Sequence, residues 1–459
     1  MSLAGDSSTH RGQSFFDLRV HICFHGRLLN LHLVVIPMFD RHTAGNIFNM
    51  LVKFLDTLYG KWCAKLIGMS SDGENTMTGR HTGFVTRMIA CTENPVFRIW
   101  CALHQIDLVV KSATEELANS EWIMFAWSFS IFLHAQANFI ISMAVKCPKK
   151  TNRWTHLGHM LQFFKDHRRK IVAYAETHCP EQTPTSRWWV ITFVVSPTIN
   201  TINVTFVILQ NRSMLIAQQE QHIHRLIGLL VAMFCVEIVQ ENDDNAQYVS
   251  VGSMRILVDA IVEHIRDQGS FAIACYNDLD ADDKNDIIRT VAMYAISLVI
   301  GLMGVKAKPD GNNMRLESDT PPVLPAQLIA IHHDKFVSKV LEPYRNHISA
   351  FWSLEDVDQT KANHRDLLNL YASDQILRVA IDRHTIEMSF DDAWDCAPGR
   401  FGHLRSFCGG LATVFANTMS VESDFSILKW EMDENRTCLM HLLLEGVFQA
   451  KQWALMETL

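Results

Sequence analysis

The sequence predicts a mixed α/β protein in which a sheet is interrupted by a long helical insertion and C-terminal helices return to the sheet. Three observations predict this. Up to about residue 118, short runs of alternating apolar residues are typical of strands. From about residue 119 to 393, apolar residues recur at helical spacing over long stretches. With 48% hydrophobic and 20% charged residues among 459, the chain can bury a large core. We expect three regions, 1–118, 119–393 and 394–459, the second being all-helical.

The first three elements are predicted to be strands. Met1–Gly5 is short and apolar and would deliver Asp6 at its end. In Phe16–Phe24 every second residue is apolar, which indicates a half-buried strand. The turn at His25-Gly26-Arg27 leads into a second alternating run, Leu29–Val35, so a hairpin is expected.

Alternating helices and strands follow the hairpin. They are expected at Thr43–Tyr59 (helix), Lys65–Ser71 (strand), Gly79–Thr92 (helix), Val96–Trp100 (strand) and Ala102–Ala118 (helix). Three hairpin-linked strands followed by βα units are, by fold-level analogy, the topology of ribonuclease H. In that topology the first and fourth strands lie side by side, so Asp6 and Asp72 are expected to be neighbours.

Two carboxylates held side by side repel each other unless a cation lies between them. A pair of divalent cations about 3.5–4 Å apart resolves this repulsion and supports in-line attack on a phosphodiester. Oxygen ligands suit Mg²⁺ or Mn²⁺. The spacing alone leaves a second interpretation open, in which Asp6 and Asp72 are solvated loop residues.

Four short segments resemble the hAT family of DNA transposases, in the order in which that family has them. They are Ser70–Gly79 (SSDGENTMTG), Arg98–His104 (RIWCALH), Asn152–Trp154 (NRW) and Ser420–Ser426 (SVESDFS). The resemblance covers nearly the whole chain and implies metal-dependent DNA cleavage and strand transfer at transposon ends.

The resemblance implies an acidic triad of Asp6, Asp72 and Glu422, which would hold Mg²⁺ or Mn²⁺ and be catalytic. Asp6 matches its motif loosely, because the family has a Trp after the first aspartate and this chain has Ser7. Asp17 is the alternative first carboxylate, although it lies on the face of its strand predicted to point away from the core.

DNA contacts are expected from Lys150, Arg153 and Trp154, with the Trp ring stacking on a base. A core role for Trp154 beside a chance basic cluster is the alternative. The formal net charge of −8 means that DNA binding would depend on local patches such as this one and the run from Lys165 to Lys170.

Cys101 and His104 form a Cys-x-x-His pair, but no second pair of ligands is apparent, so no zinc site is expected. The two side chains are expected to lie in the core near the triad. The eleven cysteines are spread singly, which indicates a reducing compartment.

The C-terminal stripe that includes Leu439, Leu443 and Val447 resembles the dimerisation region of the family, so a homodimer or higher homo-oligomer is expected. Charge-free stretches at Phe125–Val145 and Trp188–Asn211 contain polar residues, so buried helices rather than membrane spans are expected. The resemblance implies transposon-end DNA as partner and the nucleus as location.

The family has a zinc finger of the BED type ahead of its first aspartate, and this sequence has only five residues there. The expectation is therefore an N-terminally truncated copy. It is either a competent or nearly competent transposase domain or a non-enzymatic derivative that dimerises. A helical scaffold or membrane-associated protein of unrelated origin is the third hypothesis.

Overall fold

A computed structural model of the chain describes residues 1–10, 12–79, 81–149, 154, 157–239, 247–305, 320–348, 352–431 and 441–457. The chain divides into two compact units. Unit 1 comprises Met1–Ala102, Leu209–Gln221 and Lys306–Leu459, and unit 2 comprises Leu103–Ile208 and His222–Val305. The predicted boundaries, 1–118, 119–393 and 394–459, therefore differ from this division mainly in the segment after Val305, which belongs to unit 1.

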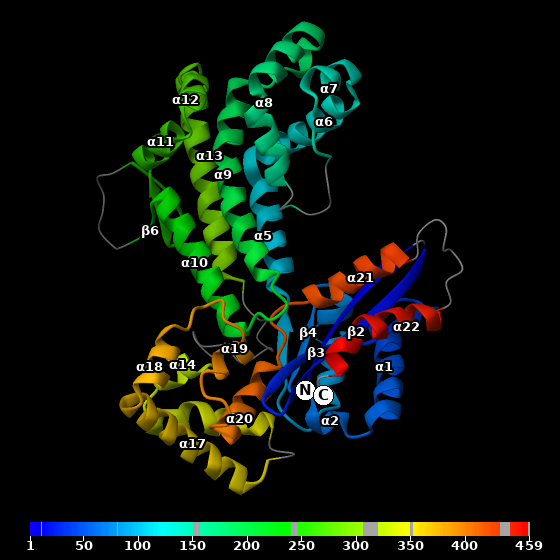
Figure 1. The fold of residues 1–459 in the computed structure, drawn as a ribbon. Helices are drawn as coiled ribbons and strands as arrows, with labels where there is room; N and C mark the ends of the chain where they lie inside the picture. The colour runs from blue at the N-terminus through cyan, green and yellow to red at the C-terminus, as the bar shows by residue number, and fades with distance from the viewer. Residues whose placement is uncertain are drawn as a thin grey trace. The chain divides into compact units, whose positions relative to one another are not determined.

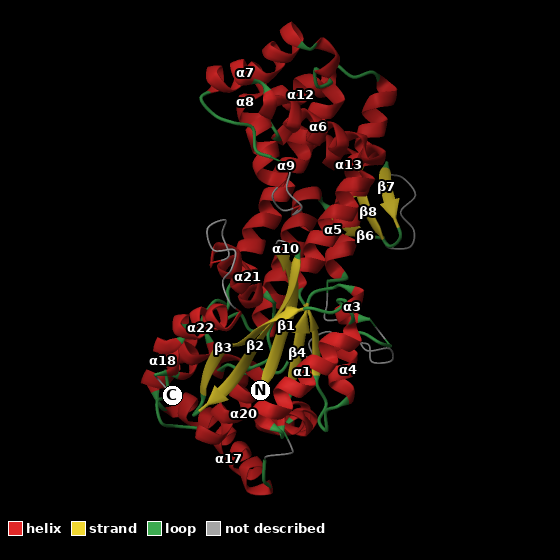
Figure 2. Ribbon diagram, turned by 90° about the vertical axis from the view of Figure 1, so that its right-hand side faces the viewer, coloured by secondary structure: helices red, strands yellow, loops and turns green. Residues whose placement is uncertain are grey.

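Unit 1 contains a five-stranded mixed sheet in the order β3-β2-β1-β4-β5 (Figure 2). Its strands are β1 (Ser2–His10), β2 (Gln13–Phe24), β3 (Arg27–Met38), β4 (Gly68–Ser71) and β5 (Phe97–Trp100). The first three strands are antiparallel, and β4 pairs in parallel with both β1 and β5. The predicted neighbourhood of the first and fourth strands is therefore confirmed.

The β2–β3 turn is built from two residues in the left-handed region, His25 at φ 47° and Gly26 at φ 74°. Two consecutive positive φ angles are those of a type I′ turn, whose twist matches the flanking strands of a hairpin. Gly at the second position adopts this conformation without strain. The predicted hairpin is therefore confirmed.

One face of the sheet is packed by the helices that follow β3 and β4. These are α1 (Ala44–Tyr59), α2 (Trp62–Lys65), α3 (Asn75–Thr78) and α4 (Phe84–Ala90). Helix α1 starts where the side chain of Thr43 caps the backbone N–H of Asn46, and it buries Ile47, Leu51 and Leu55. They join Phe16 and Leu18 of β2 in one buried cluster, so this apolar face is the main core of the sheet.

The opposite face of the sheet is covered by helices from the C-terminal part of the chain (Figure 1). Helix α21 (Met419–Glu431) packs on β1 and β2, and α22 (His441–Lys451) packs on β3. A last short helix, α23 (Trp453–Met456), follows. The prediction that C-terminal helices return to the sheet is therefore confirmed.

The rest of unit 1 is a helical segment before α21. Its helices are α14 (Pro325–Ile329), α15 (His333–Phe336), α16 (Glu342–Tyr344), α17 (Leu354–Ser373), α18 (Gln375–Asp382), α19 (Phe390–Trp394) and α20 (Gly402–Ala412). Helix α17 opens with a reciprocal cap between Ser353 and Asp356.

Unit 2 is mainly helical. Its helices, two of which begin in unit 1, are α5 (Ala102–Glu116), α6 (Glu121–Ala135), α7 (Ala137–Met143), α8 (Leu157–His178), α9 (Ser186–Leu209), α10 (Ile216–Phe234), α11 (Val258–Asp267), α12 (Ser270–Asn277) and α13 (Ala281–Met303). Helices α9 and α13 are long and apolar enough to cross a membrane by length and composition, and 61% and 56% of their most apolar windows are buried inside the protein. The bent pair Ala102–Ala135 and Ala137–Met143 passes the same test when its two parts are taken together.

Unit 2 also holds a three-stranded antiparallel sheet of β6 (Val236–Ile238), β8 (Met254–Leu257) and β7 (Tyr248–Val251), in that order. The prediction of an all-helical insertion is therefore wrong. Strands of three or four residues are too short to show an alternation of apolar residues. Gly252, which has φ 60° in the β7–β8 turn, was a local signal of a hairpin.

Candidate functional site

The strand register leads two of the predicted carboxylates toward each other. Ala4 of β1 is the parallel partner of Ser70 of β4. Continuing this register by two residues brings Asp6 opposite Asp72, with both side chains on the same face of the sheet. Both residues are buried, at 6% and 8% exposure. Strand β1 continues to His10, so Asp6 lies inside its strand and not at its end as predicted.

The segment that carries Asp72 is fixed by backbone contacts. Its Oδ1 atom accepts a hydrogen bond from the backbone N–H of Glu74 at 3.2 Å. A Cβ atom at Gly73 would collide with the indole of Trp100, so only glycine fits at this position. The hydroxyl of Thr78 donates to the carbonyl of Gly73 at 3.2 Å. These contacts hold the turn directly after β4 in one conformation.

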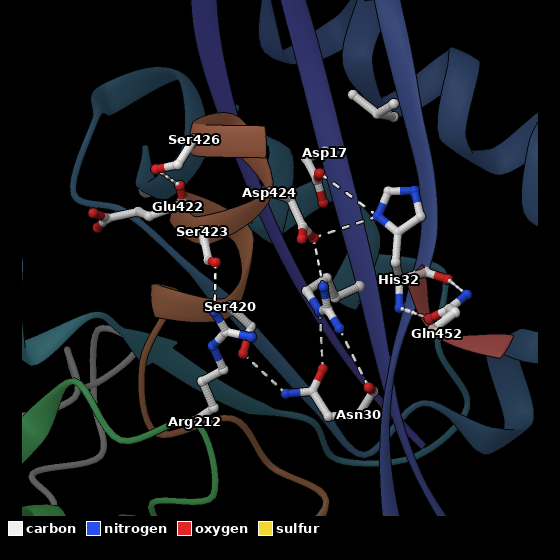
Figure 3. A network of polar contacts seen from close by, with 12 residues as sticks. Asp17, Asn30, His32, Arg212, Ser420, Glu422, Ser423, Asp424, Ser426 and Gln452 are labelled. Carbon is white, nitrogen blue, oxygen red and sulfur yellow. Dashed lines mark hydrogen bonds and ion pairs between the residues drawn. The ribbon is translucent and has the colours of Figure 1, made fainter. Parts of the chain in front are cut away.

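Glu422, the third predicted carboxylate, lies on α21. Val421 beside it packs with Ala4 of β1 and Phe415 in a small buried cluster, so α21 is anchored over the strand that carries Asp6. One carboxylate oxygen of Glu422 is shielded from solvent. In Figure 3 the side chain of Glu422 leaves the helix in a different direction from Asp424, which points toward His32.

Asp17, the alternative first carboxylate, lies in a buried polar cluster. Asp17 lies on the predicted face of β2, opposite Phe16 and Leu18 of the main core, but its side chain is 0% exposed, so this face is buried as well. The physical reason is that α21 and α22 cover this face of the sheet, which buries the polar positions of β2 as well as its apolar ones. Asp17 is also the cross-strand partner of Asp6.

His32 of β3 is the centre of this cluster (Figure 3). Its Nδ1 atom lies 3.4 Å from Asp424 Oδ2 and 3.7 Å from Asp17 Oδ2. Its Nε2 atom lies 3.2 Å from Glu445 Oε1 of α22. The ring stacks on Phe448 with the ring centres 4.5 Å apart. His32 therefore joins two strands and two helices.

A bulge in β3 aims His32 at the cluster. Between the partners Leu18–Val34 and Arg19–His32 the register shifts, which leaves Leu33 as an extra residue on β3. Bulges redirect the side chains that follow them. As a result His32 and Val35, three positions apart, both contact residues of the face that α21 and α22 cover.

The charges around His32 stabilise its cationic form. Burial by itself lowers the pKa of His32, but hydrogen bonds to Asp424 and Glu445 and the charge of Asp17 outweigh it and raise the pKa to about 9. Burial and then the charge of Asp424 raise the pKa of Asp17 well above its ordinary value. The pKa of Glu445 is lowered: burial raises it, but hydrogen bonds from His32 and the Val35 backbone outweigh that effect.

Further polar residues extend the cluster along β2 and β3. Arg19 donates from Nη1 to Asp424 Oδ2 at 2.6 Å and from Nε to Asn30 Oδ1 at 2.9 Å. The amide of Asn30 donates to the hydroxyl of Ser420 on α21 at 3.0 Å. The N-terminal part of α21 is thereby fixed to the sheet through side chains of both strands.

The edge strand β3 is capped by a side-chain amide. Gln452 accepts a hydrogen bond from the backbone N–H of His32 at 2.7 Å and donates to its carbonyl at 2.9 Å. Next to it, the backbone N–H of Val35 donates to Glu445 at 3.0 Å. These contacts satisfy outward-facing backbone groups that would otherwise invite pairing with another strand.

His32 and Glu445 were not among the predicted site residues. A signal for His32 was present, because Asn30 and His32 are two polar residues in alternation within the apolar strand β3. Polar residues on one face of such a strand indicate that this face either contacts solvent or packs against other buried polar groups. Only the packing of α21 and α22 decides between them.

The predicted DNA contacts lie in unit 2, and two of them, Lys150 and Arg153, fall outside the described residues. Trp154 is partly buried and packs on the ring of Trp127, with ring centres 5.0 Å apart. In the basic run of α8, Lys165 and Arg168 lie over the ring of Phe193. This packing engages two of the basic side chains and leaves Arg169 and Lys170 exposed.

Cys101 and His104 follow β5. Cys101 is fully buried, and its backbone N–H donates to the carbonyl of Ser71 at 3.0 Å. His104 is partly buried. Within the described part of the chain, the group of at least three His, Cys, Asp or Glu side chains placed to share a metal ion is Asp17, His32 and Asp424.

The predicted dimerisation residues lie on or before α22. Leu439 falls outside the described residues, Leu443 is 58% exposed and Val447 is partly buried. The inner face of α22 consists of Leu444 and Phe448, which pack on Phe15 and Val35.

No protein-family model matches this chain, and no curated protein shows significant similarity to it. The resemblance to hAT transposases therefore depends on the short motifs given above, and it stays a prediction.

Proposed function

We propose that this chain is a hAT-type, transposase-like protein whose RNase H-like sheet holds divalent cations between Asp6, Asp72 and Glu422. The observation that supports this most is the parallel register of β1 and β4, which, continued by two residues, leads two buried carboxylates toward each other. The strand order β3-β2-β1-β4-β5, with only β2 antiparallel to its two neighbours, is the order expected for that fold.

Helix α21 supports a role for Glu422. Residues two apart on an α-helix point about 200° away from each other. Asp424 faces Asp17 and His32, on the side of β2 and β3. Val421 faces Ala4 of β1. The Glu422 side chain therefore points away from the side of β2 and β3 that Asp424 faces, which is consistent with the proposed role beside Asp6 and Asp72.

The chemistry follows from this ligand set. Three carboxylates would hold two Mg²⁺ or Mn²⁺ ions, which would activate the attacking oxygen and stabilise the leaving oxygen of a phosphodiester. Asp6 and Asp72 come from rigid strands, while Glu422 comes from a helix whose position depends on the polar cluster. The substrate would be transposon-end DNA in the nucleus, bound by patches such as that around Trp154.

The test is a nicking assay on supercoiled plasmid with Mn²⁺ and Mg²⁺. The wild-type chain should nick only with added metal, and Asp72→Asn and Glu422→Gln should lower the rate by at least a hundredfold. Asp358→Asn is the matched control, because Asp358 is exposed on α17 and pairs only loosely with Lys361 at 3.3 Å. Equal rates in wild type and both site variants would overturn the proposal.

The second candidate is a non-enzymatic derivative that dimerises. It is favoured by exposed apolar side chains on the C-terminal helices, where Leu442 is 77% and Leu443 58% exposed. Large apolar side chains that cluster at the surface mark interaction sites. A dimer in sedimentation experiments that dissociates in Leu443→Asp supports this candidate, and a monomer at every concentration contradicts it.

A further inference from the structure

The cluster of Asp17, His32 and Asp424 has the geometry of a metal site. One ligand atom from each residue lies within 4.8 Å of the other two, and all three residues are buried. Metal–ligand bonds of about 2.0–2.2 Å in a tetrahedral site imply about 3.3–3.6 Å between ligand atoms. The distances from His32 Nδ1, 3.4 Å to Asp424 Oδ2 and 3.7 Å to Asp17 Oδ2, are close to that spacing (Figure 3).

The surroundings of Asp17 are a second observation in favour of a cation site. It is fully buried, yet neither of its carboxylate oxygens has a hydrogen-bond partner among the described residues. A buried carboxylate without hydrogen bonds is costly. Among the described residues around it, the carboxylates of Asp17, Asp424 and Glu445 face the guanidinium of Arg19, which lies on Asp424, and the ring of His32. A cation bound between Asp17 and Asp424 would give the Asp17 carboxylate a direct partner.

The surroundings of the three residues fix their orientation. The Nε2 atom of His32 is directed at Glu445, which leaves Nδ1 to face Asp17 and Asp424. Metal-binding histidines commonly donate their other ring nitrogen to a carboxylate in this way. Asp424 is held by Arg19, and Glu445 is held by the Val35 backbone and by Gln449.

We propose that Asp17, His32 and Asp424 bind one divalent transition metal, such as Zn²⁺ or Mn²⁺, in a structural site separate from the Asp6, Asp72 and Glu422 site. One nitrogen and two carboxylate oxygens suit these ions better than Mg²⁺, which prefers oxygen ligands alone. The bound ion replaces the proton of the His32 ring between the two carboxylates. It joins β2, β3 and α21, and so fixes the helix that carries Glu422.

The experiment is calorimetric titration of the metal-stripped full chain with Zn²⁺. Wild type should bind one equivalent tightly, and Asp17→Asn and His32→Gln should weaken that binding at least tenfold. Two control variants should keep it. They are His332→Gln, whose side chain is 75% exposed, and Asp72→Asn, which removes a ligand of the other proposed site. Circular dichroism checks that each variant is folded.

The outcomes separate the two proposals. Loss of Zn²⁺ in Asp72→Asn with retention in Asp17→Asn would place the metal at the other site and overturn this inference. Equal binding by wild type, Asp17→Asn and His32→Gln would overturn it as well. If a variant does not fold, anomalous diffraction from Zn²⁺-soaked wild-type crystals shows whether the metal binds at this site. A peak between the three side chains supports the site, and no peak there overturns it.

Discussion

The two faces of the five-stranded sheet are built from different chemistry. The face under α1 and α4 is apolar and includes Phe16, Leu51 and Phe84. The face under α21 and α22 is buried just as fully in places, but it holds Asp17, His32 and Asp424. Burial of apolar area explains the first face. Charges removed from water cost free energy, so burial does not explain the second face, and the metal binding proposed above would explain it.

The largest effect should come from the apolar face. Phe16 is 0% exposed and meets the ring of Phe84 edge-on at 5.4 Å. Phe16→Ala should lower the free energy of unfolding by about 3–5 kcal/mol, because it removes the ring and leaves a cavity. Urea denaturation measures this, with Phe39→Ala as control, since Phe39 is 78% exposed. Similar losses in both variants would mean that this face is not the core.

Breaking an ion pair on the polar face should lower the free energy of unfolding somewhat less than Phe16→Ala does. Arg19→Met leaves Asp424 buried without its cation, which should destabilise the metal-stripped protein by about 3 kcal/mol. Lys361→Met breaks the exposed pair with Asp358 and should cost less than about 0.5 kcal/mol. If urea denaturation gives equal losses in the free energy of unfolding for the two variants, the cluster around His32 is solvated. The second face would then not be a buried polar face.

The polar face should also make stability depend on pH, whereas the apolar face should not. His32 faces Asp17 from β2, Asp424 from α21 and Glu445 from α22, and Arg19 lies beyond Asp424. Its folded-state pKa of about 9 exceeds the ordinary value of 6.5. The proton therefore stabilises the fold fully below the unfolded-state pKa, and this stabilisation is lost as pH rises through 9.

The raised pKa of Asp17 acts in the same direction, because its protonated form stabilises the fold and this contribution is lost as pH rises through its folded-state pKa. In the presence of a chelator, the free energy of unfolding should fall on the order of 2–3 kcal/mol between pH 7 and 10. His32→Gln should flatten this dependence. An equal slope in wild type and His32→Gln would show that His32 is not the group responsible.

The smallest of these effects concerns the edge of the sheet. Gln452→Ala removes both hydrogen bonds to the backbone of His32 and should cost about 1–2 kcal/mol. Gln375→Ala is the control, because Gln375 is exposed on α18. Thermal unfolding compares the two variants, and faster aggregation of Gln452→Ala would indicate that the amide also protects the edge strand. A melting temperature unchanged from wild type would mean that the capping contacts do not contribute.

The same contrast explains what the sequence could predict. The apolar alternation of β2 and the helical spacing of α1 depend on neighbours nearby in the chain, so those elements and their order were predictable. The burial of Asp17 depends on α21, about 400 residues further along. No local pattern contains that information. The strands β6, β7 and β8 were missed for a different reason, since three or four residues are too few to establish a period.

Of the predicted triad, the neighbourhood of Asp6 and Asp72 followed from strand order, and it agrees with the parallel register of β1 and β4 when that register is continued by two residues. The place of Glu422 on a helix over β1 was implied only by the family resemblance. Sequence alone could not choose between Asp6 and Asp17 as the first carboxylate, because the choice depends on how α21 and α22 pack on the sheet. This packing puts Asp17 beside His32 and Asp424, whereas Asp6 lies on the strand that pairs with β4.

The most direct test of the Asp6, Asp72 and Glu422 site is a calorimetric titration with Mn²⁺. It should be performed in an Asp17→Asn background, so that the proposed site at His32 does not contribute. Adding Asp72→Asn or Glu422→Gln to that background should abolish the remaining Mn²⁺ binding, and adding Asp358→Asn should leave it unchanged. Undiminished binding after both site substitutions would contradict a metal centre at these residues.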